Sequence, residues 1–172
     1  MLRTSRAALV AMLIVSAVAT PANAASAWRV YQNGRWGYRI DVPRTLVSQP
    51  EPEDGGGLAF ISADGRVKLY TYGQYDIDST PNVREAQREE EWNWIGSSGR
   101  VTYRTSGTNW FVSSGIDHDG PIFYERYEQR WLDDTTCHIV FTISYPQSLR
   151  SAWHANTERT ARSFRAPSSC LG

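Results

Sequence analysis

The feature that most constrains the fold is an alternating segment in the last third of the chain, "TCHIVFTISY" at residues 136–145. Apolar side chains occupy every second position of this segment, namely Cys137, Ile139, Phe141, Ile143 and Tyr145. The positions between them are polar, except for Val140. A period of two is that of a β-strand that turns one face to a core. The segment therefore predicts a sheet that packs this face against a second layer, and Pro146 ends the strand.

Further strand patterns precede this one and are separated by turn residues. They occupy residues 36–42, 58–62, 66–72, 100–105, 109–114 and 121–132. Asp64-Gly65 predicts a hairpin turn between the second and third of these segments. Ser106-Gly107 and Asp133-Asp134 predict two later turns, so that the last four strands form a meander. The polar stretch 48–57, rich in proline and glycine, is expected to be a loop.

Two segments have helical spacing. The first begins with Thr80 as the expected N-cap and Pro81 at the first helical position, and it ends at Gly96. Its acidic "EEEW" stretch at 89–92 is expected on a solvated face. The second helix spans about 148–164. The element order predicts an α+β domain, a single antiparallel β-sheet of about seven strands with two main helices packed on it.

The N-terminal 24 residues have the layout of a secretory signal peptide. Arg3 and Arg6 precede an apolar run at 7–18, and Ala22 and Ala24 supply the small-residue cleavage pattern. The apolar run is shorter than the ~20 residues that cross a bilayer, so no membrane span is expected in the mature chain. Residues 25–172 are then expected to form one domain that is periplasmic or secreted.

The two cysteines, Cys137 and Cys170, are expected to form a disulfide, because exported proteins mature in oxidising compartments. A C-terminal helix of about 16 residues travels ~24 Å, close to the length of the strand it follows. The tail should therefore return to the beginning of that strand, where Cys137 lies. Such a bridge is worth roughly 3–4 kcal/mol in the chain-entropy model.

The triplet Asp117-His118-Asp119 is the clearest candidate for a chemical site, because it joins two carboxylates to one of three histidines. Glycine on both sides of it and Pro121 after it favour a hairpin loop. The alternative is a small hydrolase or metal-dependent enzyme centred on His118. The histidines lack the short spacing of a zinc site, and the acidic residues lack the regular spacing of a calcium loop. We therefore expect no metal and no cofactor.

Charge and aromatic content bear on the partner. The chain has 18 basic and 18 acidic side chains, which argues against a nucleic-acid partner. It also has seven tryptophans and nine tyrosines, and some aromatic residues share strand faces with arginine or lysine. These aromatic residues predict a recognition surface for a protein or small molecule of the cell envelope. The alternative is that they only cover the second face of the sheet. The candidate binding residues are Tyr70, Tyr72, Tyr124 and Arg126.

Five segments carry a resemblance to a known group of proteins: "NGRWGYRIDVP", "GGLAFISADGRVKLYTYG", "NWFVSSG", "IFYERY" and "ISYPQSLRSAW". They resemble short exported alphaproteobacterial proteins to which no activity is assigned, and the element order is similar to the Mog1/PsbP-like α/β/α sandwich. The resemblance implies a non-enzymatic binding or accessory role and transfers no catalytic residue. The alternation at 137–145 departs from a full sandwich, since it predicts one sheet face that is less covered.

Overall fold

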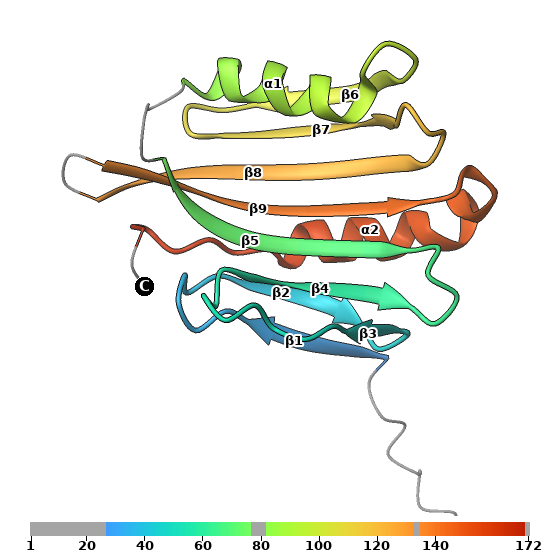
Figure 1. Ribbon diagram of the computed structural model, residues 1–172, viewed down its shortest axis with the longest axis horizontal. Helices are drawn as coiled ribbons and strands as arrows, with labels where there is room; N and C mark the ends of the chain where they lie inside the picture. Colours follow the sequence, from blue (N-terminus) through green and yellow to red (C-terminus); the bar gives the residue numbers. More distant parts are fainter. Residues whose placement is uncertain (1–26, 77–81, 133–134, 171–172) are drawn as a thin grey trace, which may run out of the picture.

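The computed structural model describes residues 27–76, 82–132 and 135–170 (Figure 1). Its main element is a seven-stranded sheet of order β3-β4-β5-β9-β8-β7-β6, in which all neighbours are antiparallel. This confirms the predicted fold class. The strands are β3 (Leu46–Ser48), β4 (Gly57–Ser62), β5 (Lys68–Asp76), β6 (Arg100–Ser106), β7 (Trp110–Ile116), β8 (Ile122–Leu132) and β9 (Thr135–Tyr145).

A separate two-stranded sheet holds β1 (Trp28–Gln32) and β2 (Arg39–Pro43). The prediction placed the β2 segment in the main sheet and missed both β1 and β3. The alternating side chains of this segment are buried, but they face the main sheet rather than extend it: Tyr38, just before β2, and Ile40 and Val42 within it are fully buried in the largest core. The seven strands are thus completed by β3, which is only three residues long.

The largest core lies between this hairpin, the helix α2 (Arg150–Ser163) and one face of the main sheet. The short 3₁₀-helix η1 (Gln147–Leu149) leads into α2 after Pro146. Phe141 of β9 packs on Phe164, which follows α2, with ring centroids 5.0 Å apart. In Figure 1, α2 passes behind β9 and β5. The predicted apolar side of β9 is therefore the side that this layer covers.

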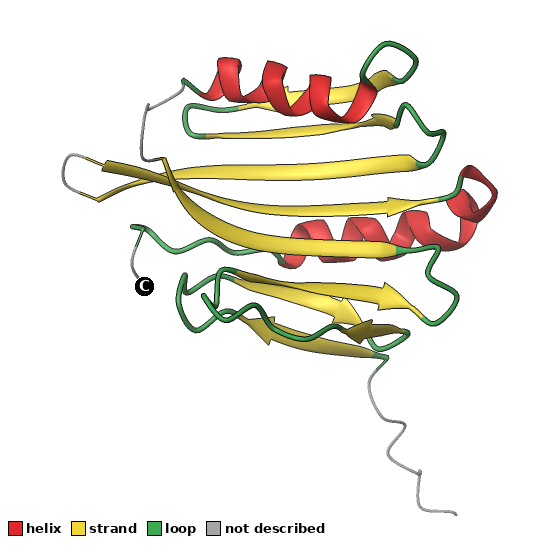
Figure 2. Cartoon of the chain, viewed as in Figure 1, coloured by secondary structure: helices red, strands yellow, loops and turns green. Residues whose placement is uncertain are grey.

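The opposite face is covered in part by α1 (Val83–Ile95), which contacts β6 and β7. A smaller core forms there from Val83, Ala86, Phe111, Tyr127 and Val140. Val140, the one apolar residue on the polar side of β9, is thus explained by this second core. Figure 2 shows α1 at the β6–β7 end of the sheet, well short of β4 and β3. The expectation of one less covered face is met.

The ends of α1 fit its sequence only in part. Asn82 is the N-cap, and its Oδ1 accepts hydrogen bonds from the backbone N–H groups of Arg84 and Glu85, both at 3.1 Å. The prediction of Thr80 as the cap is therefore wrong, and Thr80 and Pro81 themselves lie outside the described residues. Gly96 ends the helix with a φ of 48°, as predicted.

The disulfide between Cys137 and Cys170 is present, with a Cα–Cα distance of 5.7 Å and both residues fully buried. It joins the beginning of β9 to the tail that follows α2, as the length of the helix predicted. Disulfides persist mainly in proteins outside the cytoplasm.

Two other predictions fall on residues that the structure does not describe, namely the signal peptide at 1–24 and the turn at Asp133-Asp134. Within the described ranges, neither α1 nor α2 has the length and apolar character that a membrane crossing requires.

Candidate functional site

A groove of about 440 Å³ lies between the C-terminal half of α1 and strand β5. We call it the α1–β5 groove. It unites two sets of residues that the sequence analysis had named separately, the tyrosines of β5 and the Asp117-His118 turn. The residues that line it are Tyr70, Tyr72, Glu90, Asn93, Trp94, Asp117, His118, Glu125 and Thr142.

The floor of the groove is set by the register of the sheet. Partners directly opposite each other on neighbouring strands point to the same face. Tyr70 pairs with Thr142, Thr142 with Glu125, Glu125 with Ser113, and Ser113 with Arg104. These five residues form one transverse row across β5, β9, β8, β7 and β6. Because α1 covers only the β6–β7 end, the row is open between Tyr70 and Glu125.

Glu125 is the buried carboxyl of this floor, with 2% of its surface exposed. The indole Nε1–H of Trp94 donates to its Oε2 at 2.5 Å, while its Oε1 has no hydrogen-bond partner among the described residues. Burial, and then the neighbouring Glu90 charge, raise the pKa of Glu125 from 4.5 to about 8, against the lowering effect of the Trp94 hydrogen bond. The carboxyl therefore holds a proton near neutral pH.

Aromatic side chains form the walls around this carboxyl. Trp94 stacks on Phe123 with nearly parallel rings 5.0 Å apart, which fixes the indole above the sheet. On the far side Tyr72 is half-buried, and Tyr70 is 41% exposed. Burial raises the pKa of Glu90 as well, so this second carboxyl of the groove ionises less readily than a solvated glutamate.

The His118 turn closes one end of the groove and is the hairpin loop that the sequence predicted. Asp117 N–H donates to the Pro121 carbonyl at 2.8 Å, and Gly120 has a φ of 98° that suits glycine. The backbone N–H and the ring Nδ1 of His118 both bond the Trp94 carbonyl, at 3.1 and 2.9 Å. The turn is therefore tied to the end of α1.

His118 is exposed, and its ring lies between two carboxylates. Nδ1 is 2.6 Å from Asp117 Oδ1, and Nε2 is 3.5 Å from Asp119 Oδ2. The hydrogen bond to Trp94 first, and then the two carboxylates, raise the pKa of His118 above its ordinary 6.5. The three side chains offer possible metal-ligand atoms within 4.8 Å of one another. This arrangement favours a protonated imidazole, and a protonated ring nitrogen cannot bind a metal.

The other two histidines lie elsewhere. His138 of β9 pairs with Asp76, with Nδ1 and Oδ1 2.7 Å apart, and it stacks on Tyr127. His154 is exposed on α2, at the opposite face of the sheet. The three histidines therefore do not converge, as their spacing predicted.

The acidic stretch of α1 is solvated only in part: Glu89 and Trp92 are exposed, as the sequence suggested, but Glu91 is not. Glu91 is only 7% exposed, and it accepts hydrogen bonds from Ser113 Oγ at 2.7 Å and from Arg104 Nη2 at 2.6 Å. Gln87 Nε2 donates to the same serine at 3.0 Å. These contacts hold α1 on the sheet through polar groups. The interpretation failed for Glu91 because the partners of its carboxylate, Arg104 and Ser113, lie on β6 and β7, later in the chain.

Tyr124 and Arg126 do not join the other candidate residues, since they lie on the opposite face of the sheet. Tyr124 packs on Phe141 with ring centroids 5.6 Å apart. Arg126 pairs with Glu128 and lies 5.9 Å from the Phe164 ring. The structure thus separates the predicted binding residues into two pairs. The residue between Tyr124 and Arg126 must face the groove, and alternation along β8 is the signal that could have identified Glu125.

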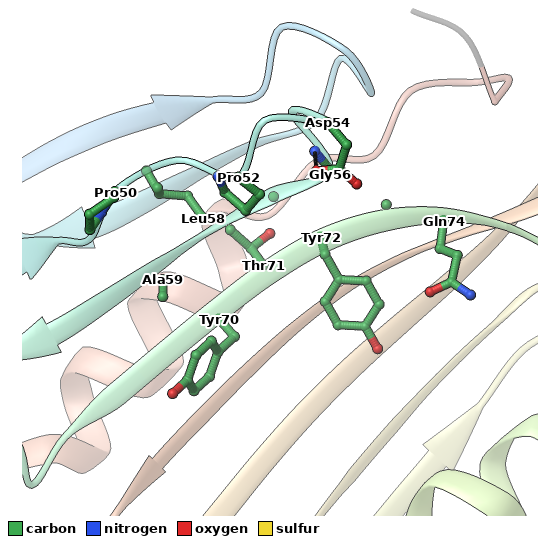
Figure 3. Close-up of a pocket in the computed structure, with 12 residues that line it drawn as sticks. Pro50, Pro52, Asp54, Gly56, Leu58, Ala59, Tyr70, Thr71, Tyr72 and Gln74 are labelled. Atoms are coloured by element: carbon green, nitrogen blue, oxygen red, sulfur yellow. Dashed lines mark hydrogen bonds between the residues drawn. The ribbon is translucent and has the colours of Figure 1, made fainter.

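A second hollow of about 440 Å³ lies on the other side of the β5 tyrosines, beside the proline-rich loop. It shares Tyr70 and Tyr72 with the α1–β5 groove and is also lined by Pro50 and Pro52. Figure 3 shows both tyrosine rings projecting from β5 away from this loop. The rings therefore separate the two hollows, and they project toward the groove.

Comparisons with known proteins identify the fold. No protein-family model matches the chain, and no curated protein matches it either. Among similar solved structures is the solution structure of cyanobacterial PsbP (CyanoP) from Synechocystis sp. PCC 6803. The match has a TM-score of 0.60 and 10% sequence identity, and it covers 87% of this chain and 99% of that one. At this identity the likeness shows the fold alone, and it confirms that the chain has a PsbP-like α+β fold.

Proposed function

We propose that this chain is a non-enzymatic binding or accessory protein of the periplasm or of the secreted fraction. Its ligand lies in the α1–β5 groove. The observation that carries the proposal is the construction of this groove: aromatic walls surround a buried carboxyl, Glu125, of which one oxygen has no partner in the described chain. Concave sites with apolar walls and a few convergent polar groups are typical of ligand sites.

Two observations support a location outside the cytoplasm. The first is the signal-peptide pattern of residues 1–24. The second is the buried disulfide between Cys137 and Cys170. We expect N-terminal sequencing of the protein from its natural host to begin at Ala25. A mature protein that retains residue 1 or 2 would contradict export.

The contacts of His118 favour binding over catalysis. Its ring is bonded to a backbone carbonyl and flanked by two carboxylates, which fix the turn and stabilise the protonated imidazole. A general base at neutral pH needs the neutral ring with a free nitrogen directed at its substrate. The turn therefore serves to shape one end of the groove.

A thermal-shift panel tests the proposal with compounds of each charge class: neutral sugars, carboxylates, amino acids and amines. We expect at least one class to raise the Tm of the mature protein. The shift should be lost in Tyr70→Leu, because this exposed ring lines the groove. It should be retained in the matched control Tyr103→Leu, whose ring is 56% exposed on β6. The proposal is wrong if no class shifts the Tm, or if both variants respond like the parent.

A further inference from the structure

We propose that the α1–β5 groove binds the ammonium group of an alkylamine. An N–H of the ammonium donates to Glu125, and the alkyl chain lies against Tyr70, Tyr72 and Trp94. This inference rests on the proposed function, because it assigns a chemical class to the ligand of the same groove.

The charges of the groove select a cation. Three of its lining side chains are carboxyls, from Glu90, Asp117 and Glu125, and Asp119 flanks the same turn. The basic side chain among the lining residues is His118, whose ring is already flanked by Asp117 and Asp119. An anionic ligand would oppose the ionisation of these carboxyls and gain no opposite charge from them, whereas a cation gains a negative partner when Glu125 or Glu90 ionises.

The unpartnered oxygen of Glu125 needs a hydrogen-bond partner, and once the carboxyl is ionised that partner must be a donor. Buried polar atoms in folded proteins nearly always have partners, because an unpaired one is costly. Oε2 is satisfied by the Trp94 indole, but Oε1 is buried and unbonded in the described chain. An ammonium N–H supplies the donor that Oε1 lacks and also supplies the opposite charge.

The aromatic walls suit the rest of such a ligand. A cation within about 6 Å of an aromatic face is attracted by the ring, and tryptophan is the strongest of these partners. Trp94 is held in place by its stacking on Phe123 and by its bond to Glu125. Tyr70 and Tyr72 give apolar surface for a short alkyl chain. The volume of about 440 Å³ lies within the range of small-molecule sites.

Binding should release a proton. Glu125 is protonated near neutral pH, and it must ionise to pair with an ammonium group. The carboxyl proton then passes to solvent, while the ammonium keeps its own protons. The titratable groups that interact with Glu125 are Glu90 and Glu91 of α1, Tyr72 of β5 and Tyr127 of β8, and the Trp94 indole bonds it. The two acids resist its ionisation, so affinity should rise as the pH increases from 6 to about 8.

Calorimetric titration with n-butylammonium chloride tests the proposal on the mature, disulfide-bonded protein. We expect saturable binding that releases protons, seen as a heat that depends on the ionisation enthalpy of the buffer. Tetramethylammonium, which has charge but no N–H, and 1-butanol, which has a donor but no charge, should each bind at least about tenfold more weakly. Butyrate should not bind. Nα-acetyl-lysine amide distinguishes a lysine side chain from a free amine, and the tighter of the two amines identifies the source.

Two pairs of variants assign the effect to the groove. Glu125→Gln should weaken butylammonium binding at least about tenfold and abolish proton release. Glu85→Gln, at an exposed position of the same helix, should leave both unchanged. Tyr70→Leu should weaken binding, while Tyr103→Leu should not. The Tm of each variant shows that it folds, and the tyrosine pair keeps the test valid if Glu125→Gln does not fold.

The proposal is overturned if neither amine binds, if butanol binds as tightly as butylammonium, or if Glu125→Gln binds like the parent. If a neutral or anionic compound of the thermal-shift panel occupies the groove instead, the binding function stands and the amine class is wrong. If no compound of any class binds, both are wrong.

Discussion

Replacing Glu125 with glutamine is expected to remove most of the dependence of the protein's stability on pH between 5 and 8. In the folded protein, burial and the charge of Glu90 raise the pKa of this carboxyl from 4.5 to about 8. In the unfolded chain the carboxyl is solvated and its pKa returns to the ordinary value. The unfolded state therefore gives up a proton that the folded state retains.

The sign follows from proton linkage. Stability falls with rising pH wherever the folded state binds more protons than the unfolded state. For Glu125 this window runs from 4.5 to about 8, and the stability present below it is lost across it. At about 1.4 kcal/mol per pH unit, the loss amounts to about 5 kcal/mol over the whole window and about 3 kcal/mol by pH 7.

Glu125→Gln keeps an oxygen that can accept the hydrogen bond from the Trp94 indole, but it cannot ionise. The buried amide N–H₂ takes the place of the unbonded Oε1 and costs about 1–3 kcal/mol. We therefore expect the variant to be less stable than the parent at pH 5 and as stable or more stable at pH 8. The crossing of the two pH profiles is the diagnostic feature.

Urea unfolding at pH 5, 6, 7 and 8, with the disulfide intact, measures this difference. Raised pKa values at Glu90 and His118 make the stability of both proteins fall with rising pH. The parent-minus-variant difference therefore reports residue 125 together with its coupling to Glu90. Glu85→Gln, at an exposed position, is the control and should follow the parent at every pH. The reasoning is refuted if the free energy of unfolding of Glu125→Gln falls with pH as steeply as that of the parent. It is also refuted if the parent is equally stable at pH 5 and pH 8.

Three further changes have defined outcomes. Replacing Cys137 and Cys170 with alanine should lower the free energy of unfolding by about 2–4 kcal/mol, and two free thiols in the unfolded, unreduced parent would show that no bridge forms. An NMR titration should give His118 a pKa above 6.5, because a carbonyl and two carboxylates contact its ring. The contribution of His118 to the free energy of unfolding is thus present below pH 6.5 and lost as the pH rises through the folded-state pKa. An NMR titration midpoint at or below pH 6.5 would contradict this. Gly73→Ala should lower the free energy of unfolding by ~1–3 kcal/mol, because the added Cβ would overlap the buried Trp36 ring. An unchanged midpoint in urea would show that the strand shifts to accommodate the methyl group, and would contradict this prediction.

Much of the fold could be predicted because local pattern and final burial agree. The alternation that ends at Tyr145 marks the most buried strand, and its one irregular position, Val140, belongs to the second core. β1 could not be predicted in the same way, because it lacks clean alternation and forms by pairing with β2. That β2 packs on the main sheet rather than within it is decided by α2, which lies more than 100 residues further along the chain.

The candidate site shows a similar division. The sequence identified Tyr70, Tyr72 and His118 as unusual, but their common groove depends on where α1 crosses the sheet. Glu125 gave one local signal, its alternation with Tyr124 and Arg126 along β8, but its charged neighbours favoured a solvent-facing interpretation. Its burial is a consequence of Trp94, which is 31 residues away in the sequence and closes over it.

The disulfide makes a closed covalent ring of residues 137–170, and this ring passes through both a central strand and the helix that covers it. Chain ends are usually where a folded protein first opens. Here the segment that ends at Cys170 stays beside the beginning of β9 as long as the bridge is intact, so hydrogen exchange near Cys170 should be slower than in the reduced protein. A protease that cut the η1 connection would leave both fragments attached to each other. The segment that follows α2 is thus covalently tied to β9, a largely buried central strand of the sheet.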